Sequence, residues 1–162
     1  VLEPSIIQTA KGTDALENRI DFKSYDANGN LLQVAKTDGI DITYVYGYGD
    51  SLPIAKLENL DRSNLTTAQQ NAINAAKLAS KNDINATTEV ALRTDLDNLR
   101  AEFPEAMVTT YTYDPLIGVT SMTDPKGYTI YYKYDGLNRL QRVKDADGYI
   151  MSENKYHYLL DN

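Results

Sequence analysis

Residues 111–114 read Tyr-Thr-Tyr-Asp and residues 132–135 read Tyr-Lys-Tyr-Asp, so one pattern recurs at an offset of 21 positions. In each copy a second aspartate stands ten residues after the first, and a glycine follows it three residues later, as Asp124 with Gly127 and Asp145 with Gly148. A repeat at a fixed spacing indicates a repeated supersecondary unit, which constrains an architecture more strongly than local propensity does. The sequence therefore predicts a repeat scaffold before it indicates any activity.

A third copy lies in the N-terminal part of the chain, where Gly39 follows Asp26 at the same thirteen-residue spacing that the other copies show. A degenerate fourth copy follows, with Gly47 in the aspartate position. Apolar residues recur five and eight positions after the aspartates: Leu31, Val119, Leu140 and Val34, Met122, Val143. Positions of opposite parity lie on opposite faces of a straight strand, so we expect a bulge or a late strand start in each copy.

The copies have the local signals of antiparallel hairpins. Asn28-Gly29 favours a tight turn because both residues tolerate positive φ. From residue 40 to residue 48 the chain alternates in the period of a strand, which predicts Ile42, Tyr44, Tyr46 and Tyr48 on one face and Thr43, Val45 and Gly47 on the other. Residues 1–21 are weakly patterned and are interpreted as irregular.

The composition changes between Tyr48 and Tyr111, where tyrosine is absent and alanine, asparagine and leucine dominate. Thr67 with Gln70 has the form of a capping box, and Thr87 or Thr88 can cap a second helix that ends at Pro104. Two stripes at helical spacing follow these caps: Ala68, Ala72, Ala75, Ala79 and Leu92, Leu96, Leu99, Phe103. The segment therefore predicts an antiparallel helical hairpin that docks on the sheet.

These observations together predict an α+β fold, an antiparallel β-hairpin repeat sheet with an inserted α-helical hairpin. The expected parts are N-terminal repeats in residues 1–60, the helical hairpin in residues 61–105 and C-terminal repeats in residues 106–162, all in one compact domain.

Composition excludes several function classes. With 23 acidic and 16 basic residues among 162, the net charge of −7 argues against a nucleic-acid partner, which needs clustered Lys and Arg. The chain has no cysteine, which excludes disulfides and thiolate sites, and no apolar run of about 18 residues, which argues against membrane insertion. Residues 47–49 lack the third glycine of a phosphate loop, so no cofactor is expected. The oligomeric state is left open.

The repeated aspartates allow a catalytic or a structural interpretation. Glycosidases use paired carboxylates, and residues 26–30 place oxygen-bearing side chains at alternating positions, as a calcium loop does. An aspartate at the end of a strand more often accepts backbone N–H bonds in the turn, and we favour that interpretation. His157 is the only histidine and is expected on a strand surface. We therefore predict no enzyme activity and no metal site.

The 13 tyrosines, beside two phenylalanines and no tryptophan, leave two interpretations open. Cross-strand aromatic packing would stabilise the sheet, and this is the interpretation we favour. The alternative is a wet aromatic platform on which sugar rings stack. The candidate ligand face consists of Tyr44, Tyr46, Tyr111, Tyr113, Tyr132 and Tyr134.

The repeat resembles the YD repeat of RHS (rearrangement hot spot) proteins, whose unit reads roughly Gly-x-Thr-x-Tyr-x-Tyr-Asp-x-x-Gly-Arg-Leu. The resemblance is carried by Tyr113-Asp114, Tyr134-Asp135, residues 124–127 and residues 137–140, and it extends over residues 20–58 and 107–158. Asn138 departs from the unit's usual glycine. Residues 107–123 also resemble a variant common in large surface proteins of Bacteroidota.

In that family the hairpins form strips that coil into a hollow shell, which often encloses a toxic domain. Some members are displayed at cell surfaces and are suggested to bind carbohydrate. The resemblance implies a non-catalytic wall segment of a secreted or surface protein, with neighbouring repeats as partners and glycan binding as the alternative. The glycine-rich run that marks self-cleavage in the family does not follow residues 124–127, so that activity is not carried over.

Overall fold

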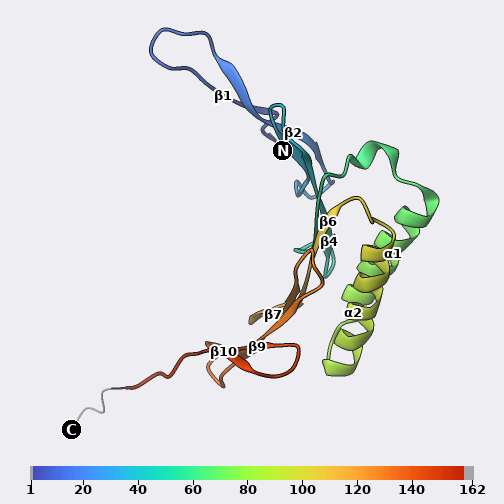
Figure 1. The fold of residues 1–162 in the computed structure, drawn as a ribbon, viewed down its shortest axis with the longest axis vertical. Coiled ribbons are helices and arrows are strands. Elements are labelled where there is room, and N and C mark those ends of the chain that lie inside the picture. The colour runs from blue at the N-terminus through green and yellow to red at the C-terminus, as the bar shows by residue number, and fades with distance from the viewer. Residues whose placement is uncertain (1, 159–162) are drawn as a thin grey trace. The chain divides into compact units, whose positions relative to one another are not determined.

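A computed structural model describes residues 2–158 and contains ten strands, two α-helices and one 3₁₀ turn (Figure 1). The strands are antiparallel, and their hydrogen-bonded neighbours follow the order of the chain from β1 to β10. This confirms the predicted α+β sheet of hairpins with an inserted helical hairpin. The element bounds are β1 (Ile6–Thr9), β2 (Glu17–Tyr25), β3 (Leu31–Lys36), β4 (Asp41–Gly47), β5 (Leu52–Glu58), η1 (Arg62–Asn64), α1 (Thr67–Lys81), α2 (Ala86–Ala101), β6 (Met107–Asp114), β7 (Gly118–Thr123), β8 (Thr129–Tyr134), β9 (Leu140–Asp145) and β10 (Ile150–Glu153).

The chain divides into two compact units, Val1–Thr110 and Tyr111–Asn162, called here the first and the second unit. The division falls inside β6, whereas the parts predicted from the sequence follow changes in composition. It reflects where the apolar core lies, because every buried hydrophobic side chain of the described residues belongs to the first unit. The three-part division into residues 1–60, 61–105 and 106–162 stays a prediction.

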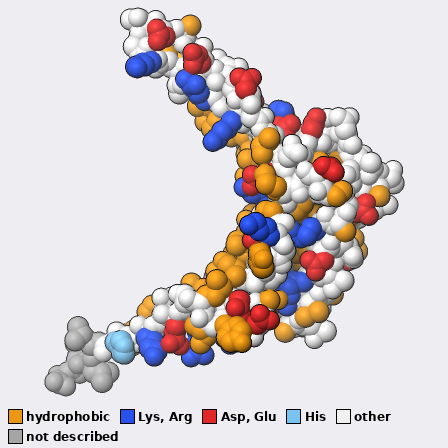
Figure 2. Space-filling model, viewed as in Figure 1, with side chains coloured by type: hydrophobic (Ala, Val, Ile, Leu, Met, Phe, Trp, Pro, Cys, Tyr) orange, Lys and Arg blue, Asp and Glu red, His pale blue; other side chains and the backbone are white. Residues whose placement is uncertain are grey.

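The N-terminal residues form a hairpin and are not irregular as the sequence suggested. β1 pairs with β2 from Ile6 opposite Asp21 to Thr9 opposite Glu17, with a register shift after Ile7. All four side chains of β1 are exposed, so no alternation of buried and exposed positions marked the strand. Acidic and basic side chains are interspersed over this hairpin, at the top of the view in Figure 2.

One turn geometry closes four of the hairpins, and an aspartate begins each of them. Oδ1 of Asp26 accepts the backbone N–H of Asn28 and of Asn30, at 2.8 and 2.9 Å. Asp124, Asp135 and Asp145 accept the equivalent two N–H groups, two and four residues ahead, at 2.8 to 3.1 Å. The predicted structural role of these aspartates is thereby confirmed, since carboxylate oxygens commonly accept such local bonds.

The fourth position of each of these turns has positive φ, namely Gly29, Gly127, Asn138 and Gly148. The tight turn predicted at Asn28-Gly29 forms, but only Gly29 has positive φ, and Asn28 does not share this conformation. Asn138, at a φ of 59°, takes the place of the usual glycine, and asparagine tolerates this region better than most residues.

Bulges resolve the parity of the repeated apolar positions. In the β2–β3 pair Ser24 lies opposite Gln33 and Tyr25 opposite Leu31, which leaves Leu32 extra. In the β8–β9 pair Lys133 lies opposite Arg142 and Tyr134 opposite Leu140, which leaves Gln141 extra. Both extra residues stand six positions after the aspartate of their copy. The bulge that the pattern predicts therefore recurs at one position of the repeat.

The caps of the helical hairpin lie one or more residues before the predicted ones. α1 is capped by Thr66 in a capping box with Gln69, not by Thr67 with Gln70. The side chain of Asn85 caps α2, and Thr88 completes its capping box, so neither Thr87 nor Thr88 is the cap itself. Asn85 accepts two N–H groups, at 2.9 and 3.1 Å, and asparagine is as good a cap as threonine or better.

The helices cover the face of β4, β5 and β6 that carries Val45, Ile54 and Val108, and together they form the core. The leucine stripe of α2 is confirmed, because its members and Phe103 are buried. The alanine stripe of α1 is only partly right: Ala72 and Ala79 pack against the core, but Ala68 and Ala75 are exposed, and the fully buried residues are Ile73, Ala76 and Ser80. The single isoleucine decides which face of α1 turns inward, since it offers more apolar area than alanine.

Tyr48 does not share the face of Tyr44 and Tyr46. It has a positive φ of 50° and packs against the core. Its Oη donates to Oδ2 of Asp83 at 2.7 Å, and its N–H donates to the buried Ser80 Oγ at 3.0 Å. The turn after β4 thus connects this strand to the end of α1. The alternation of faces therefore ends at Gly47, one residue before the predicted end at Tyr48.

The second unit packs through polar and aromatic side chains. Thr112 Oγ1 lies 2.8 Å from Thr120 Oγ1 and 2.6 Å from Ser121 Oγ. Tyr134 Oη donates to the carbonyl of Val119 at 3.0 Å. Hydrophobic side chains lie on the surface of this unit (Figure 2). Tyr149, Ile150 and Met151 are exposed. Within residues 2–158 no helix has the length and apolarity needed to cross a membrane.

Candidate functional site

The candidate site is an opening between β3 and β4. Their pairing runs only from Ala35 opposite Asp41 to Gln33 opposite Thr43, while β4 stays paired with β5 as far as Gly47. Beyond Gln33 the two strands separate. The chain closes the far end again, because Asn30 Nδ2 donates to the carbonyl of Asp50 at 2.8 Å. The opening is thus framed at one end by strand pairing and at the other by this bond.

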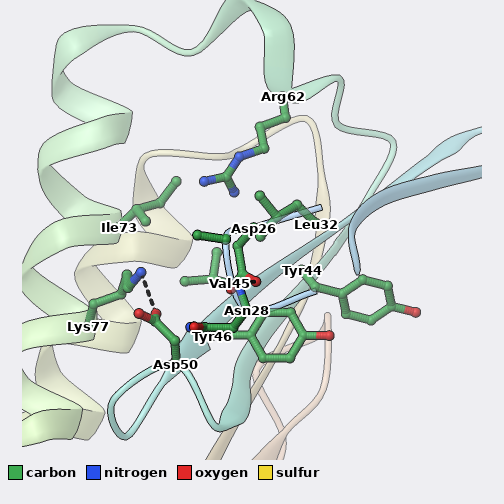
Figure 3. A pocket seen from close by; sticks show the side chains of 11 residues that line it. Asp26, Asn28, Leu32, Tyr44, Val45, Tyr46, Asp50, Arg62, Ile73 and Lys77 are labelled. Carbon is green, nitrogen blue, oxygen red and sulfur yellow. Dashed lines mark hydrogen bonds and ion pairs between the residues drawn. The ribbon is translucent and has the colours of Figure 1, made fainter. Parts of the chain in front are cut away.

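A cavity of about 220 Å³ occupies this opening (Figure 3). Its walls come from the turn between β2 and β3, from β3, from β4 and the turn after it, from η1 and from α1. The view places Ile73 and Lys77 of α1 on one side and the rings of Tyr44 and Tyr46 on the other. The lining residues are Asp26, Ala27, Asn28, Leu32, Tyr44, Val45, Tyr46, Asp50, Arg62, Ile73 and Lys77.

Both carboxylates of the cavity have partners. Lys77 Nζ lies 2.6 Å from Oδ1 of Asp50, which joins α1 to the turn after β4. Asp26 takes part in its turn, and its Oδ2 also accepts the side-chain amide of Asn30 at 2.9 Å. Burial acts to raise the pKa of Asp26, but the hydrogen bonds from Asn30 and Asn28 outweigh it and lower the pKa. Asp26 is therefore an ionised structural group and not a poised acid.

Arg62 contributes the remaining charge of the cavity. Its side chain extends from η1 towards the space between Ile73 and Leu32 (Figure 3). Nη1 is buried and has no hydrogen-bond partner among the described residues. Burial lowers the pKa of this guanidinium from its ordinary value. No sequence pattern pointed to this residue, because it lies in the short segment between β5 and α1.

Tyr44 and Tyr46 are the two residues of the predicted ligand face that line the cavity. Both are half-buried on the face of β4 opposite the core. Burial raises the pKa of Tyr46, and the neighbouring Tyr44 and Asp26 act in the same direction. The phenol of Tyr46 is thus a neutral hydrogen-bonding group attached to an apolar ring. Such a wall beside a few charged groups is typical of sites for small molecules.

The other four residues of the predicted face belong to the second unit. The rings of Tyr111 and Tyr113 lie 6.5 Å apart at 36°, and burial raises the pKa of Tyr113 to about 12. Tyr132 lies opposite Val143 in the sheet, and the hydroxyl of Tyr134 is bound to a backbone carbonyl. These contacts suit packing. A ligand role for the six tyrosines stays a prediction.

Sequence reasoning did not select the most exposed tyrosines. Tyr128 and Tyr149 are 71% and 72% exposed and follow the glycines of two equivalent aspartate turns. The signal was present as a repeated Asp-x-x-Gly-Tyr. Arg139 lies 4.0 Å from the ring centroid of Tyr156 and 5.2 Å from that of Tyr158, which is cation–π geometry.

Metal ligation and histidine chemistry find no geometric support in the described part of the chain. Residues 2–158 contain no group of three or more His, Asp or Glu side chains placed to hold an ion. At the calcium-like segment the carboxylate of Asp26 is engaged by the N–H groups of its own turn. His157 is exposed, beyond the last strand.

Comparison with known proteins identifies the repeat. Residues 118–150 match the family model for the RHS repeat, a stretch that runs from β7 to the start of β10 and includes the turns at Asp124, Asp135 and Asp145. No curated protein matches the chain with a significant score. The resemblance to RHS/YD-repeat proteins is thereby confirmed.

Proposed function

We propose that the chain is a non-catalytic wall segment of a large secreted or surface-displayed RHS protein. The observation that carries the proposal is the repetition of one turn. The same aspartate geometry closes three hairpins inside the matched repeat and a fourth at Asp26, outside the matched residues. A module built by repeating one hairpin extends by adding neighbours, as solenoid and repeat architectures do.

The surface of the second unit suits neighbouring repeats as partners. Its fully buried side chains are Thr112 and Ser121, while Tyr128, Tyr149 and Ile150 are exposed. Repeat units commonly bury their apolar faces only when further units stack on them. Adjacent repeats of a parent protein would cover these side chains in the same way.

The non-catalytic part of the proposal rests on the carboxylates. Asp26, Asp124, Asp135 and Asp145 each have an oxygen that accepts two backbone N–H groups. A general acid or nucleophile needs a carboxylate free to reach substrate. No cofactor is needed for the proposed role.

Antibody labelling tests the proposed secreted or surface location. Antibodies raised against the purified chain should label intact cells of the producing organism or detect the protein in its culture medium, and protease added outside should remove the cell-bound signal. A signal found only after lysis would overturn the secreted or surface part of the proposal. An antibody against a cytoplasmic protein of the same cells serves as the lysis control.

A glycan-binding module is the alternative function, favoured by the tyrosine rings that line the cavity. A broad glycan array probed with the chain separates the two functions. A wall segment shows no saturable binding that depends on Tyr111 and Tyr132, and the double variant Tyr111→Ala/Tyr132→Ala only unfolds at a lower temperature. Saturable binding that is lost in that variant would replace the wall proposal by the glycan-binding one.

A further inference from the structure

We propose that the cavity between β3, β4 and α1 binds a small organic monocarboxylate, whose carboxylate group is held by the guanidinium of Arg62. The inference concerns the first unit alone and does not rest on the wall role. It starts from a charged group with no partner in a cavity that strand separation creates.

Arg62 is the residue of the cavity that indicates a ligand. Its Nη1 is buried without a hydrogen-bond partner among residues 2–158. Arg62 as a whole is half-buried, but a guanidinium N–H removed from water without an acceptor is unfavourable, because the lost hydrogen bond to water is not replaced. A carboxylate replaces it well, since the planar fork of arginine matches two carboxylate oxygens in two parallel N–H···O bonds.

The charges around Arg62 select the valence of the anion. Asp50 is paired with Lys77, and Asp26 is engaged in its turn, so neither carboxylate is paired with Arg62. The four charged side chains of the lining, two basic and two acidic, already sum to zero. A monocarboxylate adds one negative charge, whereas inorganic phosphate carries about one to two negative charges near pH 7 and brings the larger charge close to Asp26 and Asp50. Like charges at such range repel, so the site favours a carboxylate over phosphate.

The walls select the body attached to the carboxylate. Leu32, Val45 and Ile73 present apolar side chains, and the rings of Tyr44 and Tyr46 line the other side. The volume of about 220 Å³ corresponds to about seven water molecules at about 30 Å³ each. This is below the range of about 300–1,000 Å³ typical of drug-sized ligands. The ligand is therefore of the size of one ring or a short chain.

Calorimetric titration of the full 162-residue chain tests the site. Sodium benzoate and sodium glucuronate are the two probes, because one carries an aromatic body and the other a sugar body. Benzyl alcohol controls for the body without the charge, and inorganic phosphate for the charge without the body. We expect at least one of the two acids to bind saturably and both controls to bind more weakly. The acid that binds more tightly shows whether the source is a free organic acid or an acidic sugar.

Variants assign the binding to the guanidinium. Arg62→Gln should weaken the binding of the acid about tenfold or more, as expected for the loss of charge-assisted hydrogen bonds. Arg62→Lys keeps the charge but not the fork, so its affinity for the acid should lie between that of Arg62→Gln and that of the original chain. Arg93→Gln, on α2 and outside the cavity lining, removes the same charge from a half-buried arginine and should leave binding unchanged.

Three results would overturn the proposal: no saturable binding of either acid, equal binding by Arg62→Gln, or phosphate binding as tight as the acids. Arg62→Gln should fold, because Arg62 is half-buried and the substitution removes a buried N–H that has no hydrogen-bond partner among the described residues. Thermal unfolding of each variant verifies this. If Arg62→Gln fails to fold, Arg62→Lys decides, and benzoate and glucuronate affinities equal to those of the original chain would then contradict the role of the fork.

Discussion

The two units of the chain are stabilised in different ways. The first unit has a helical hairpin packed on β4, β5 and β6, and its core contains fully buried leucine, isoleucine and phenylalanine side chains. In the second unit the buried side chains are Thr112 and Ser121, and the hairpins are held by aspartate turns, a threonine cluster and half-buried tyrosines. The difference shows that the hairpins of the second unit pair without a buried apolar core among the described residues, and that the inserted helices provide one in the first unit.

The largest expected effect is the loss of stability when an apolar side chain is truncated, which should be greater in the first unit than in the second. Leu96, 2% exposed, lies in the core beneath the sheet. Leu96→Ala should lower the free energy of unfolding by about 2–5 kcal/mol, because it removes buried methyl groups and leaves a cavity. Val143→Ala, at a half-buried position of β9, should lower it by about 1 kcal/mol. Urea unfolding followed by circular dichroism measures both.

An equal loss from the two substitutions would contradict the comparison, since it would mean that the second unit depends on apolar packing as much as the first does. Val90→Ala provides the control for the helix itself, because Val90 lies on α2 but is exposed. That substitution should change stability by less than about 0.5 kcal/mol.

The next effect concerns the contact between β4 and α1. A Cβ added at Gly47 would lie 2.3 Å from Ser80 Oγ and 2.7 Å from Ile54 Cγ2. Gly47→Ala should therefore lower the free energy of unfolding by about 1–3 kcal/mol through overpacking. Gly136→Ala is the matched control in the second unit, where nothing lies within 4 Å of the added carbon. Thermal unfolding that shows no loss for Gly47→Ala would show that the helices are not closely packed on β4.

Much of the fold could be predicted because the same sequence pattern occurs in several copies along the chain. The aspartate turns and the bulges follow from spacing and parity: the turn recurs at Asp26, Asp124, Asp135 and Asp145, and the bulge recurs in the copies that begin at Asp26 and Asp135. The helices followed from composition and the leucine stripe. The α1 face was missed because four alanines give a regular stripe with little apolar area, and one isoleucine outweighs it.

The candidate site could be predicted only in part. Tyr44 and Tyr46 were selected because they alternate on one strand, and they do line the cavity. Arg62, Lys77 and Asp50 come from three separate elements, and their meeting depends on how α1 crosses β4 and where β3 leaves it. A single sequence carries no periodic signal for such a meeting. Tyr48 was placed on the wrong face because a positive φ ends the alternation.

A smaller effect is expected at low pH, and it distinguishes the aspartate turns of the second unit from one another. Hydrogen bonds from Arg139 lower the pKa of Asp135 to about 2, with Nε and Nη2 at 2.8 and 2.5 Å. A pKa below the ordinary 3.8 means that the ionised carboxylate stabilises the fold above about pH 4, and that this contribution is lost as the pH falls towards 2. A carbon-13 NMR titration of the carboxyl group measures it directly.

Arg139→Gln should raise the pKa of Asp135 towards its ordinary value and move the acid unfolding of the second unit to higher pH. Arg142→Gln removes an arginine that pairs with Glu153 at 2.8 Å, and it should leave the Asp135 titration in place. An unchanged Asp135 titration in Arg139→Gln would show that the turn, and not the ion pair, lowers the pKa.

The smallest effect tests whether the turns are equivalent. Asn138 has a φ of 59° at the position where Gly127 and Gly148 have 87°. Asn138→Gly should change the free energy of unfolding by no more than about 0.5 kcal/mol, because asparagine already tolerates this conformation. Asn138→Ala and Gly148→Ala should each lower it by about 1–2 kcal/mol, since alanine has no side-chain bond to offset the left-handed backbone. Thermal unfolding of the three variants measures these effects. A large gain from Asn138→Gly would show that the departure from the family's glycine strains this turn and that the hairpins are not interchangeable units.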